Sequence, residues 1–211
     1  MNWAHAGFDL LGQRVTWADL IGNIAALATV VLATRRSMWT WPVQLTGAVL
    51  LFIASIGAHI TGNALKQVLF GGLAIYGWLR WRRGMREEGG LAVRPATTRE
   101  RSALVGMMVA GTAVVALIFG WLNSLGLNVS WAPWPDAYIF VGSAVATFAQ
   151  GKALLEFWWI YVLVDVVGVP LAFSSGLVVS GTVYGIFFVM VLVGFRSWLK
   201  EYRSSREVVA S

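Results

Sequence analysis

The chain has 211 residues, of which 58% are hydrophobic and only 12% are charged, and it carries a net charge of +6 with no cysteine. Soluble globular proteins contain about 25% charged residues. The composition therefore excludes a water-soluble enzyme or nucleic-acid-binding domain, and the lack of cysteine excludes a disulfide scaffold. The sequence predicts an all-α membrane protein, with the lipid bilayer rather than a nucleic acid as the partner of its surface.

The apolar residues form seven charge-poor runs that follow a short N-terminal segment. Residues 1–17 contain one basic residue, Arg14, and lack the features of a cleaved signal peptide. We therefore expect the first apolar run to be a retained transmembrane helix. The runs approach the roughly 20 residues that cross a bilayer as a helix, and they do not alternate as barrel strands do. The expected spans are 18–34, 40–58, 62–80, 103–122, 136–152, 157–174 and 177–195.

The basic residues are distributed unevenly about these spans. Seven spans place the termini on opposite sides, and all sixteen Lys and Arg residues except Arg14 and Lys66 then fall on one side. Basic residues mark cytoplasmic loops, so we expect the N-terminus outside and the C-terminus in the cytoplasm. Tryptophan rings often anchor at the membrane interface, and we expect that position for those near span ends: Trp17, Trp39, Trp41, Trp78, Trp81, Trp121, Trp134, Trp158, Trp159 and Trp198.

The sequence matches itself at a constant offset of 117 residues. Paired in this register are Trp17 with Trp134, Asp19 with Asp136, Arg35 with Lys152, Trp41 with Trp158, Phe70 with Phe187, Gly77 with Gly194, and Trp81 with Trp198. One ungapped register with three tryptophan pairs indicates two copies of a three-helix unit. An odd number of helices inverts the next copy unless one more helix intervenes, so the fourth span is expected to join two parallel units.

The expected organisation follows from this repeat. A polar stretch between the third and fourth spans is typical of a cytoplasmic linker. Parallel repeats place a substrate site between the two halves, near the middle of the membrane. The expected segments are an N-terminal segment at 1–17, a first unit at 18–82, a linker at 83–102, a joining helix at 103–122, a second unit at 135–199 and a tail at 200–211.

Polar side chains inside a membrane are costly unless they are paired or face a cavity. In the sixth span, Trp158, Tyr161 and Asp165 share one helix face by their spacing. An aromatic face suits a flat ring, and amide or carboxylate groups suit hydroxyls. The alternative is that such groups bond across helices as packing contacts. The candidate substrate-binding residues are Gln44, Asn63, Gln67, Trp158, Tyr161, Asp165 and Tyr184.

Patterns of enzymes are missing from the sequence. It contains no phosphate-binding loop of the G-x-x-x-x-G-K-[ST] kind. The two histidines, His5 and His59, are far apart and lack the spacing of metal ligands. We therefore expect a protein that is not an enzyme and uses no metal or cofactor.

Several short motifs together resemble those of the PnuC family of vitamin transporters. They are Trp41–Pro42, the segment from Gln67 to the Y-G-W ending at Trp78, Asp136–Ala137, Glu156 with Trp158, V-D-V at 164–166, and G-x-R-x-W from Gly194 to Trp198. The resemblance implies a three-plus-one-plus-three helix plan related to that of the SWEET sugar transporters. It also implies a homotrimer in the bacterial plasma membrane that moves a vitamin down its gradient, with intracellular phosphorylation trapping the product.

The substrate implied by the resemblance is riboflavin. Members that carry nicotinamide riboside usually have an E-N-W motif where this chain has Glu156–Phe157–Trp158. The stretches WPDAYIFVG and VDVVGVPLAFSSGL are more similar to the riboflavin-transporting branch. Nicotinamide riboside remains the alternative substrate, and a membrane receptor that binds without transporting is an alternative of another class.

Overall fold

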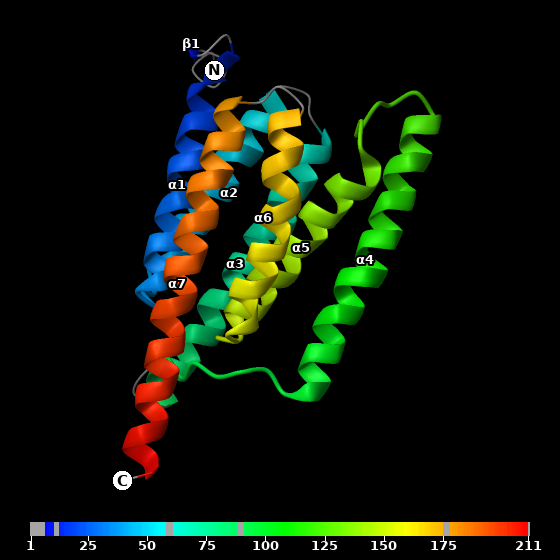
Figure 1. The fold of residues 1–211 in the computed structure, drawn as a ribbon. Coiled ribbons are helices and arrows are strands. Elements are labelled where there is room, and N and C mark those ends of the chain that lie inside the picture. Colours follow the sequence, from blue (N-terminus) through cyan, green and yellow to red (C-terminus); the bar gives the residue numbers. More distant parts are fainter. Residues whose placement is uncertain (1–6, 11–12, 58–60, 88–90, 175–177, 211) are drawn as a thin grey trace.

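The computed structural model describes residues 7–10, 13–57, 61–87, 91–174 and 178–210. In this part of the chain, a two-stranded antiparallel hairpin precedes seven helices (Figure 1). The predicted all-α architecture is confirmed, with the hairpin as an addition that was not expected. The elements are β1 (Gly7–Leu10), β2 (Gln13–Thr16), α1 (Trp17–Thr34), α2 (Thr40–Gly57), α3 (Thr61–Glu87), α4 (Thr98–Ser124), α5 (Pro133–Gly151), α6 (Glu156–Ser174) and α7 (Val178–Ala210).

Successive helices run in opposite directions, so α1 begins at the upper end of the molecule and α7 finishes at the lower end (Figure 1). Helices α1–α3 pack in chain order, as do α5–α7. The two groups meet where α1 contacts α7 and where α3 contacts α5. Helix α4 stands at the edge of the bundle and packs on α5 (Figure 1).

The helices extend beyond the expected spans at the basic end of the molecule. Helix α3 continues to Glu87 and α4 already begins at Thr98, so the connection is shorter than the linker expected at 83–102. Helix α7 continues through the expected tail at 200–211 as far as Ala210. Arg, Lys, Glu and Met are good helix formers, so a helix does not stop where its apolar stretch ends.

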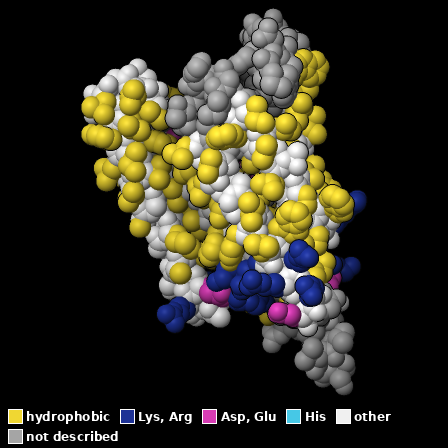
Figure 2. All heavy atoms as spheres, turned by 180° about the vertical axis from the view of Figure 1, so that it is seen from behind, with side chains coloured by type: hydrophobic (Ala, Val, Ile, Leu, Met, Phe, Trp, Pro, Cys, Tyr) yellow, Lys and Arg dark blue, Asp and Glu magenta, His cyan; other side chains and the backbone are white. Residues whose placement is uncertain are grey.

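The apolar surface agrees with a membrane protein. Three helical stretches of the described chain are long and apolar enough to cross a bilayer, namely Thr98–Ser124, Glu156–Ser174 and Gly181–Ser204. Two shorter apolar stretches are Leu20–Thr34 and Thr40–Ile53. Figure 2 shows hydrophobic side chains over much of the height of the molecule, with Lys and Arg side chains gathered at its lower end.

Four tryptophans expected at the membrane interface are instead fully buried in the core. Trp41 and Trp158 lie on the two glycines that the repeat also pairs: a Cβ on Gly77 would approach the Trp41 ring to 2.2 Å, and one on Gly194 would approach the Trp158 ring equally closely, at 2.2 Å. The interface prediction was wrong for these two, because the missing glycine side chains make room for their indole rings inside the bundle. It was also wrong for Trp81 and Trp198, whose rings pack edge-on against those of Trp41 and Trp158, respectively.

Hydrogen bonds and backbone conformations recur at the same offset. The Trp81 indole nitrogen donates to the carbonyl of Gln150 at 3.0 Å. The Trp198 indole nitrogen donates to the carbonyl of Ala33 at 2.9 Å. Arg36 and Ala153, which follow α1 and α5, both adopt the left-handed conformation, with φ of 54° and 53°. Each pair is separated by 117 residues, and each indole bond joins one group of three helices to the other.

Candidate functional site

A cavity of about 180 Å³ lies between the two groups of three helices. Its described walls come from α1, α2, α3, α5, α6 and α7, whereas α4 supplies no residue to them. The cavity therefore lies at the junction between the two groups, where a relative movement of the groups would change its shape. Its lining is Gly22, Ala25, Ala26, Thr29, Val30, Ala33, Gln44, Gly47, Ala48, Leu51, Gln67, Phe70, Thr147, Gln150, Phe157, Trp158, Tyr161, Phe187 and Val191.

The two sides of the cavity differ in side-chain size. Helices α1 and α2 supply mainly small residues, including Gly22, Gly47 and Ala48. Helix α6 supplies three aromatic residues in its first two turns, Phe157, Trp158 and Tyr161. The space therefore exists because one side has little side-chain volume, while the other side presents aromatic faces on which a flat ring can stack.

Two buried hydrogen-bond donors of the lining have no partner among the described residues. They are the Nε2 of Gln150 and the Nε1 of Trp158, whose residues are 3% and 1% exposed. An unpaired buried polar group costs roughly 1–3 kcal/mol. The hydroxyls behave differently, because Thr147 pairs with the Tyr161 hydroxyl at 3.0 Å and also donates to a carbonyl of its own helix. The free donors are therefore groups that a ligand in the cavity could satisfy.

The structure brings together four of the predicted site residues. Gln44, Gln67, Trp158 and Tyr161 all line the cavity.

The other three predicted residues are placed differently. Asp165 is buried one turn beyond Tyr161 and its Oδ2 has no partner in the described part of the chain, but it is not in the lining. Tyr184 is 37% exposed and also lies outside the lining. The side chain of Asn63 lies outside the described residues.

Sequence reasoning missed several lining residues, including Gln150, Thr147 and Phe157. The offset of 117 residues was the signal that could have found the first two. It pairs Ala33 with Gln150 and Val30 with Thr147, and all four line the cavity. The paired Phe70 and Phe187 also line it, as do Gln44 and Tyr161.

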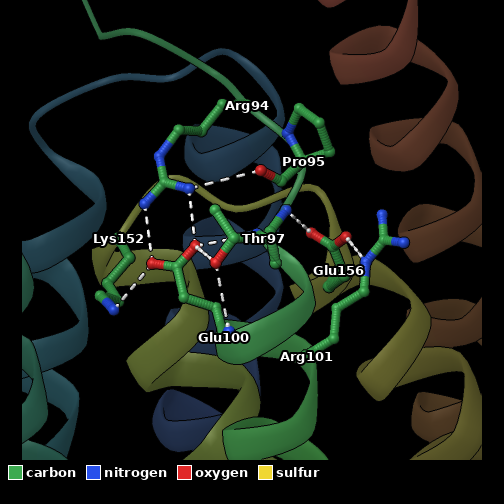
Figure 3. A network of polar contacts seen from close by, with 8 residues as sticks. Arg94, Pro95, Thr97, Glu100, Arg101, Lys152 and Glu156 are labelled. Carbon is green, nitrogen blue, oxygen red and sulfur yellow. Dashed lines mark hydrogen bonds and ion pairs between the residues drawn. The ribbon is translucent and has the colours of Figure 1, made fainter.

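A polar network fixes the turn between α5 and α6 at the lower end of the molecule (Figure 3). Glu100 accepts two hydrogen bonds from Arg94, at 2.7 and 2.8 Å, and one from Lys152 at 3.0 Å. It also completes a capping box with Thr97 at the start of α4. The Arg94 guanidinium, the Thr97 backbone and Lys152 hold the pKa of this carboxyl well below its usual range.

A second carboxylate ties the same turn to the connection that precedes α4 (Figure 3). Glu156, the first residue of α6, accepts from the backbone nitrogen of Ala96 at 2.7 Å and from Arg101 at 2.9 Å. Arg94 also pairs with Leu154 in a parallel bridge. The connection is therefore bound along the α5–α6 turn. No group of three or more His, Cys, Asp or Glu side chains suited to a metal occurs in the described chain.

Comparisons with known proteins agree on one family. The model of a family described as nicotinamide mononucleotide transporter matches residues 16–200. The riboflavin/roseoflavin transporter RibM of Streptomyces davaonensis is 47% identical, over 99% of this chain and 98% of that protein. The nicotinamide riboside transporter PnuC of Escherichia coli K12 is 24% identical, over 91% of this chain and 89% of that protein.

One solved structure has the same fold. The crystal structure of the vitamin B3 transporter PnuC matches with a TM-score of 0.67 and 20% sequence identity. The match covers 89% of this chain and 83% of that chain.

Proposed function

The chain belongs to the nicotinamide mononucleotide transporter family, and from that premise we propose that it imports riboflavin across the bacterial plasma membrane by facilitated diffusion. The family is one of transporters, not enzymes. The resemblance to PnuC proteins that the sequence motifs indicated is thereby confirmed.

The observation that carries the choice of substrate is the 47% identity to a riboflavin/roseoflavin transporter along essentially the whole of both chains. The nicotinamide riboside transporter of Escherichia coli is half as similar, at 24% identity. Phe157, which replaces the usual amide of the E-N-W motif, lines the cavity beside Trp158 and adds aromatic surface there. Riboflavin has a three-ring system and a chain of hydroxyls, which such a lining fits better than a pyridine ring.

In the proposed mechanism, α1–α3 and α5–α7 form two parallel units joined by α4, and all seven helices cross the membrane. The paired indole bonds, the paired glycine–tryptophan contacts and the paired left-handed residues support this repeat. The ring of riboflavin would stack on Trp158, and amides such as Gln44, Gln67 and Gln150 would bind its hydroxyls. Rocking of the two units would then open the cavity to each side in turn.

The proposal keeps the remaining expectations. Asp165, Tyr184 and Asn63 would meet the substrate in other positions of the two units. The N-terminus would lie outside and the C-terminus in the cytoplasm, where phosphorylation would trap the vitamin. A homotrimer would cover part of the apolar surface of α4, on which Val109, Leu117 and Trp121 are more than 60% exposed.

Titration of the purified protein with riboflavin and, separately, with nicotinamide riboside tests the substrate. We expect saturable riboflavin binding that Trp158→Ala weakens at least tenfold. Trp159→Ala is the matched control, because Trp159 is the next residue but is 53% exposed and lies outside the cavity lining. Binding of nicotinamide riboside alone would overturn the substrate and favour the alternative.

Uptake into vesicles separates a transporter from a receptor. Proteoliposomes that hold the protein should equilibrate riboflavin across the bilayer, and Trp158→Ala should slow the exchange. Riboflavin binding in detergent without any flux in vesicles would favour a non-transporting receptor. Proton coupling is tested in the same vesicles, because Asp165→Asn should abolish a pH dependence of uptake that passes through this carboxyl.

A further inference from the structure

A second and larger cavity, of about 580 Å³, lies at the lower end of the molecule. One wall is the face of α3 that carries Tyr76, Arg80 and Arg83, which follow one another at helical spacing. The other walls are the connection at 91–94 and the end of α5 at 151–153. The cavity therefore lies where the first group of helices meets the second, and its lining shares no residue with that of the candidate site.

The charge of this second cavity is strongly positive. Its lining includes four cationic side chains and one carboxylate, namely Arg80, Arg83, Arg94 and Lys152 against Glu87. Glu100 neutralises part of this charge, because it binds both Arg94 and Lys152 from outside the lining (Figure 3). Arg80 and Arg83 form no ion pair with any residue that the structure describes, so their charges are available to a ligand.

The repeat-related place in the other half of the molecule shows what this cavity lacks. There, Arg36 and Glu201 form an ion pair of 2.7 Å between the end of α1 and α7. The residues 117 positions away are Ala153 and Gly84, which both line the second cavity. In one half of the molecule, an acid and a base close this position. In the other half, the two small residues leave it open.

The surrounding charges are also arranged differently. Arg80 stands where the other half has Ser197, and Arg83 where it has Lys200. The second cavity has therefore lost the ion pair of Arg36 with Glu201, and it carries two arginines that no described acid pairs. Its only carboxylate, Glu87, stands where the other half has Ser204. Hollows that are rich in arginine and lie between transmembrane helices at the cytoplasmic side are typical sites for phosphate head groups.

We propose that this second cavity binds a phosphate group carried by an amphiphilic molecule. The guanidinium groups of Arg80 and Arg83 bind the phosphate oxygens, for which their planar fork of donors is suited. Tyr76, which stacks on Phe148 at a centroid distance of 5.4 Å, provides an apolar wall for the remainder of the ligand. Two sources carry this chemistry, a phosphomonoester of the imported vitamin or the head group of an anionic lipid.

Substitutions at Gly84 give a sharp test of the site. A Cβ on Gly84 would meet no atom within 4 Å, so a larger residue is tolerated there. Gly84→Glu restores the carboxylate that Glu201 supplies in the other half, and Gly84→Gln adds nearly the same volume without the charge. A second pair of variants removes charge: Arg80→Gln combined with Arg83→Gln, and Arg82→Gln as the control on the same helix but outside the lining.

Two measurements on the full chain distinguish the sources. In detergent without added phosphate, calorimetry follows the binding of riboflavin 5′-phosphate, with riboflavin as the reference ligand. In nanodiscs of mixed phosphatidylglycerol and phosphatidylcholine, native mass spectrometry counts the phosphatidylglycerol that stays bound. We expect the binding of at least one of these ligands to fall tenfold or more in Gly84→Glu and in the double arginine variant. In Gly84→Gln and Arg82→Gln, the binding of the same ligand should fall less than threefold.

If the charge variants weaken the binding of riboflavin 5′-phosphate more than their controls do, and do not weaken that of riboflavin, the ligand is a soluble phosphomonoester. A lipid is indicated when retained phosphatidylglycerol shows the same pattern. The proposal would be overturned if each variant and its control changed the binding of both ligands equally. It would also be overturned if the unaltered chain bound neither riboflavin 5′-phosphate nor phosphatidylglycerol. If the unaltered chain bound one of the phosphate ligands but not riboflavin, the result would count against the transport function and would support the phosphate site.

Discussion

The indole rings of Trp81 and Trp198 pack against each other in the core, with their centroids 6.2 Å apart. They belong to the third helix of the first and second groups, and each donates its N–H to a carbonyl of the opposite group. The pair is therefore the point at which the two halves of the molecule are joined by equivalent bonds in both directions. Because the two indole bonds are equivalent, removal of either one should have a similar effect.

Trp81→Phe and Trp198→Phe should destabilise the protein by similar amounts. Each change removes one buried hydrogen bond, which contributes about 0.5–1.5 kcal/mol. The two carbonyls keep a backbone donor, Ala153 for Gln150 and Arg36 for Ala33. Thermal unfolding in detergent, followed by circular dichroism, measures the loss. Trp78→Phe is the control, since Trp78 lies on the same helix but is 38% exposed. A loss confined to one of the two buried positions would contradict the equivalence of the halves.

Gly77→Ala and Gly194→Ala should also destabilise the protein, because the added methyl would overlap an indole ring at 2.2 Å. Overpacking of a core typically costs about 1–3 kcal/mol. The two variants should differ in ligand binding. Gly194→Ala displaces Trp158 of the cavity and should weaken riboflavin binding more than Gly77→Ala, which displaces Trp41. Gly72→Ala is the control, as no atom lies within 4 Å of its Cβ position, and it should leave stability unchanged or raise it.

Gln150→Leu should have opposite effects on stability and on binding. The variant removes a buried amide nitrogen that has no partner in the described chain, so the free protein should unfold at an equal or higher temperature. Riboflavin affinity should fall about tenfold to a hundredfold, as expected for the loss of 1.5–3 kcal/mol of hydrogen bonding.

A matched control for Gln150→Leu is Thr112→Val on α4. The Thr112 hydroxyl is also buried without a partner among the described residues, but it lies outside the cavity lining. Its removal should change stability in the same direction and leave riboflavin affinity unchanged. If Gln150→Leu bound riboflavin as tightly as the unaltered protein, the amide would not belong to the binding site.

The stability that Glu100 adds to the folded protein should be lost in acid. Hydrogen bonds from Arg94, from the Thr97 backbone and from Lys152 lower the pKa of this carboxyl in the folded state. A lowered pKa adds stability above the pKa of the unfolded chain, about 4.3 for glutamate, and the contribution is lost as the pH falls further. Glu100→Gln should therefore lower the unfolding temperature at pH 7 and reduce its fall between about pH 5 and pH 3. Glu87→Gln, which replaces an exposed carboxylate, should leave the slope unchanged.

The orientation in the membrane can be measured with single cysteines, since the sequence contains none. Leu127 lies between α4 and α5 and is 61% exposed, and Ser204 is exposed near the lower end of α7. A membrane-impermeant maleimide should label Leu127→Cys in intact cells. It should label Ser204→Cys only after the membrane is permeabilised. The reverse pattern would show that the basic end faces outward.

The sequence predicts the helices well because long apolar runs bounded by charge are a strong signal. It does not predict the helical ends at the basic side, where α3 and α7 continue through charged residues. The hairpin was missed because each of its strands has four residues, too few for alternation to be recognised. The bridge between Arg94 and Leu154 and the hydrogen bond from Ala96 to Glu156 were missed because each joins residues more than 50 positions apart.

The candidate site was predicted in part. Trp158 and Tyr161 were found because one helix spacing places them together, and Gln44 because the repeat pairs it with Tyr161. Gln150 is polar and lies in a span, but its unpaired nitrogen becomes visible only when its neighbours are known. The four buried tryptophans show the same limit, because a tryptophan near the end of a span is compatible with both an interface and a core position.

The crossed indole bonds also have a consequence for the integrity of the chain. A fragment that ended after α3 would hold the Trp81 donor and the Ala33 acceptor, and the fragment from α4 onward would hold the Trp198 donor and the Gln150 acceptor. Neither fragment holds the carbonyl to which its own indole nitrogen donates, but together they would satisfy both indole donors, as two subunits do across a symmetric interface. A chain cut between α3 and α4 is therefore expected to reassemble from co-expressed pieces, with each half acting as the template on which the other folds.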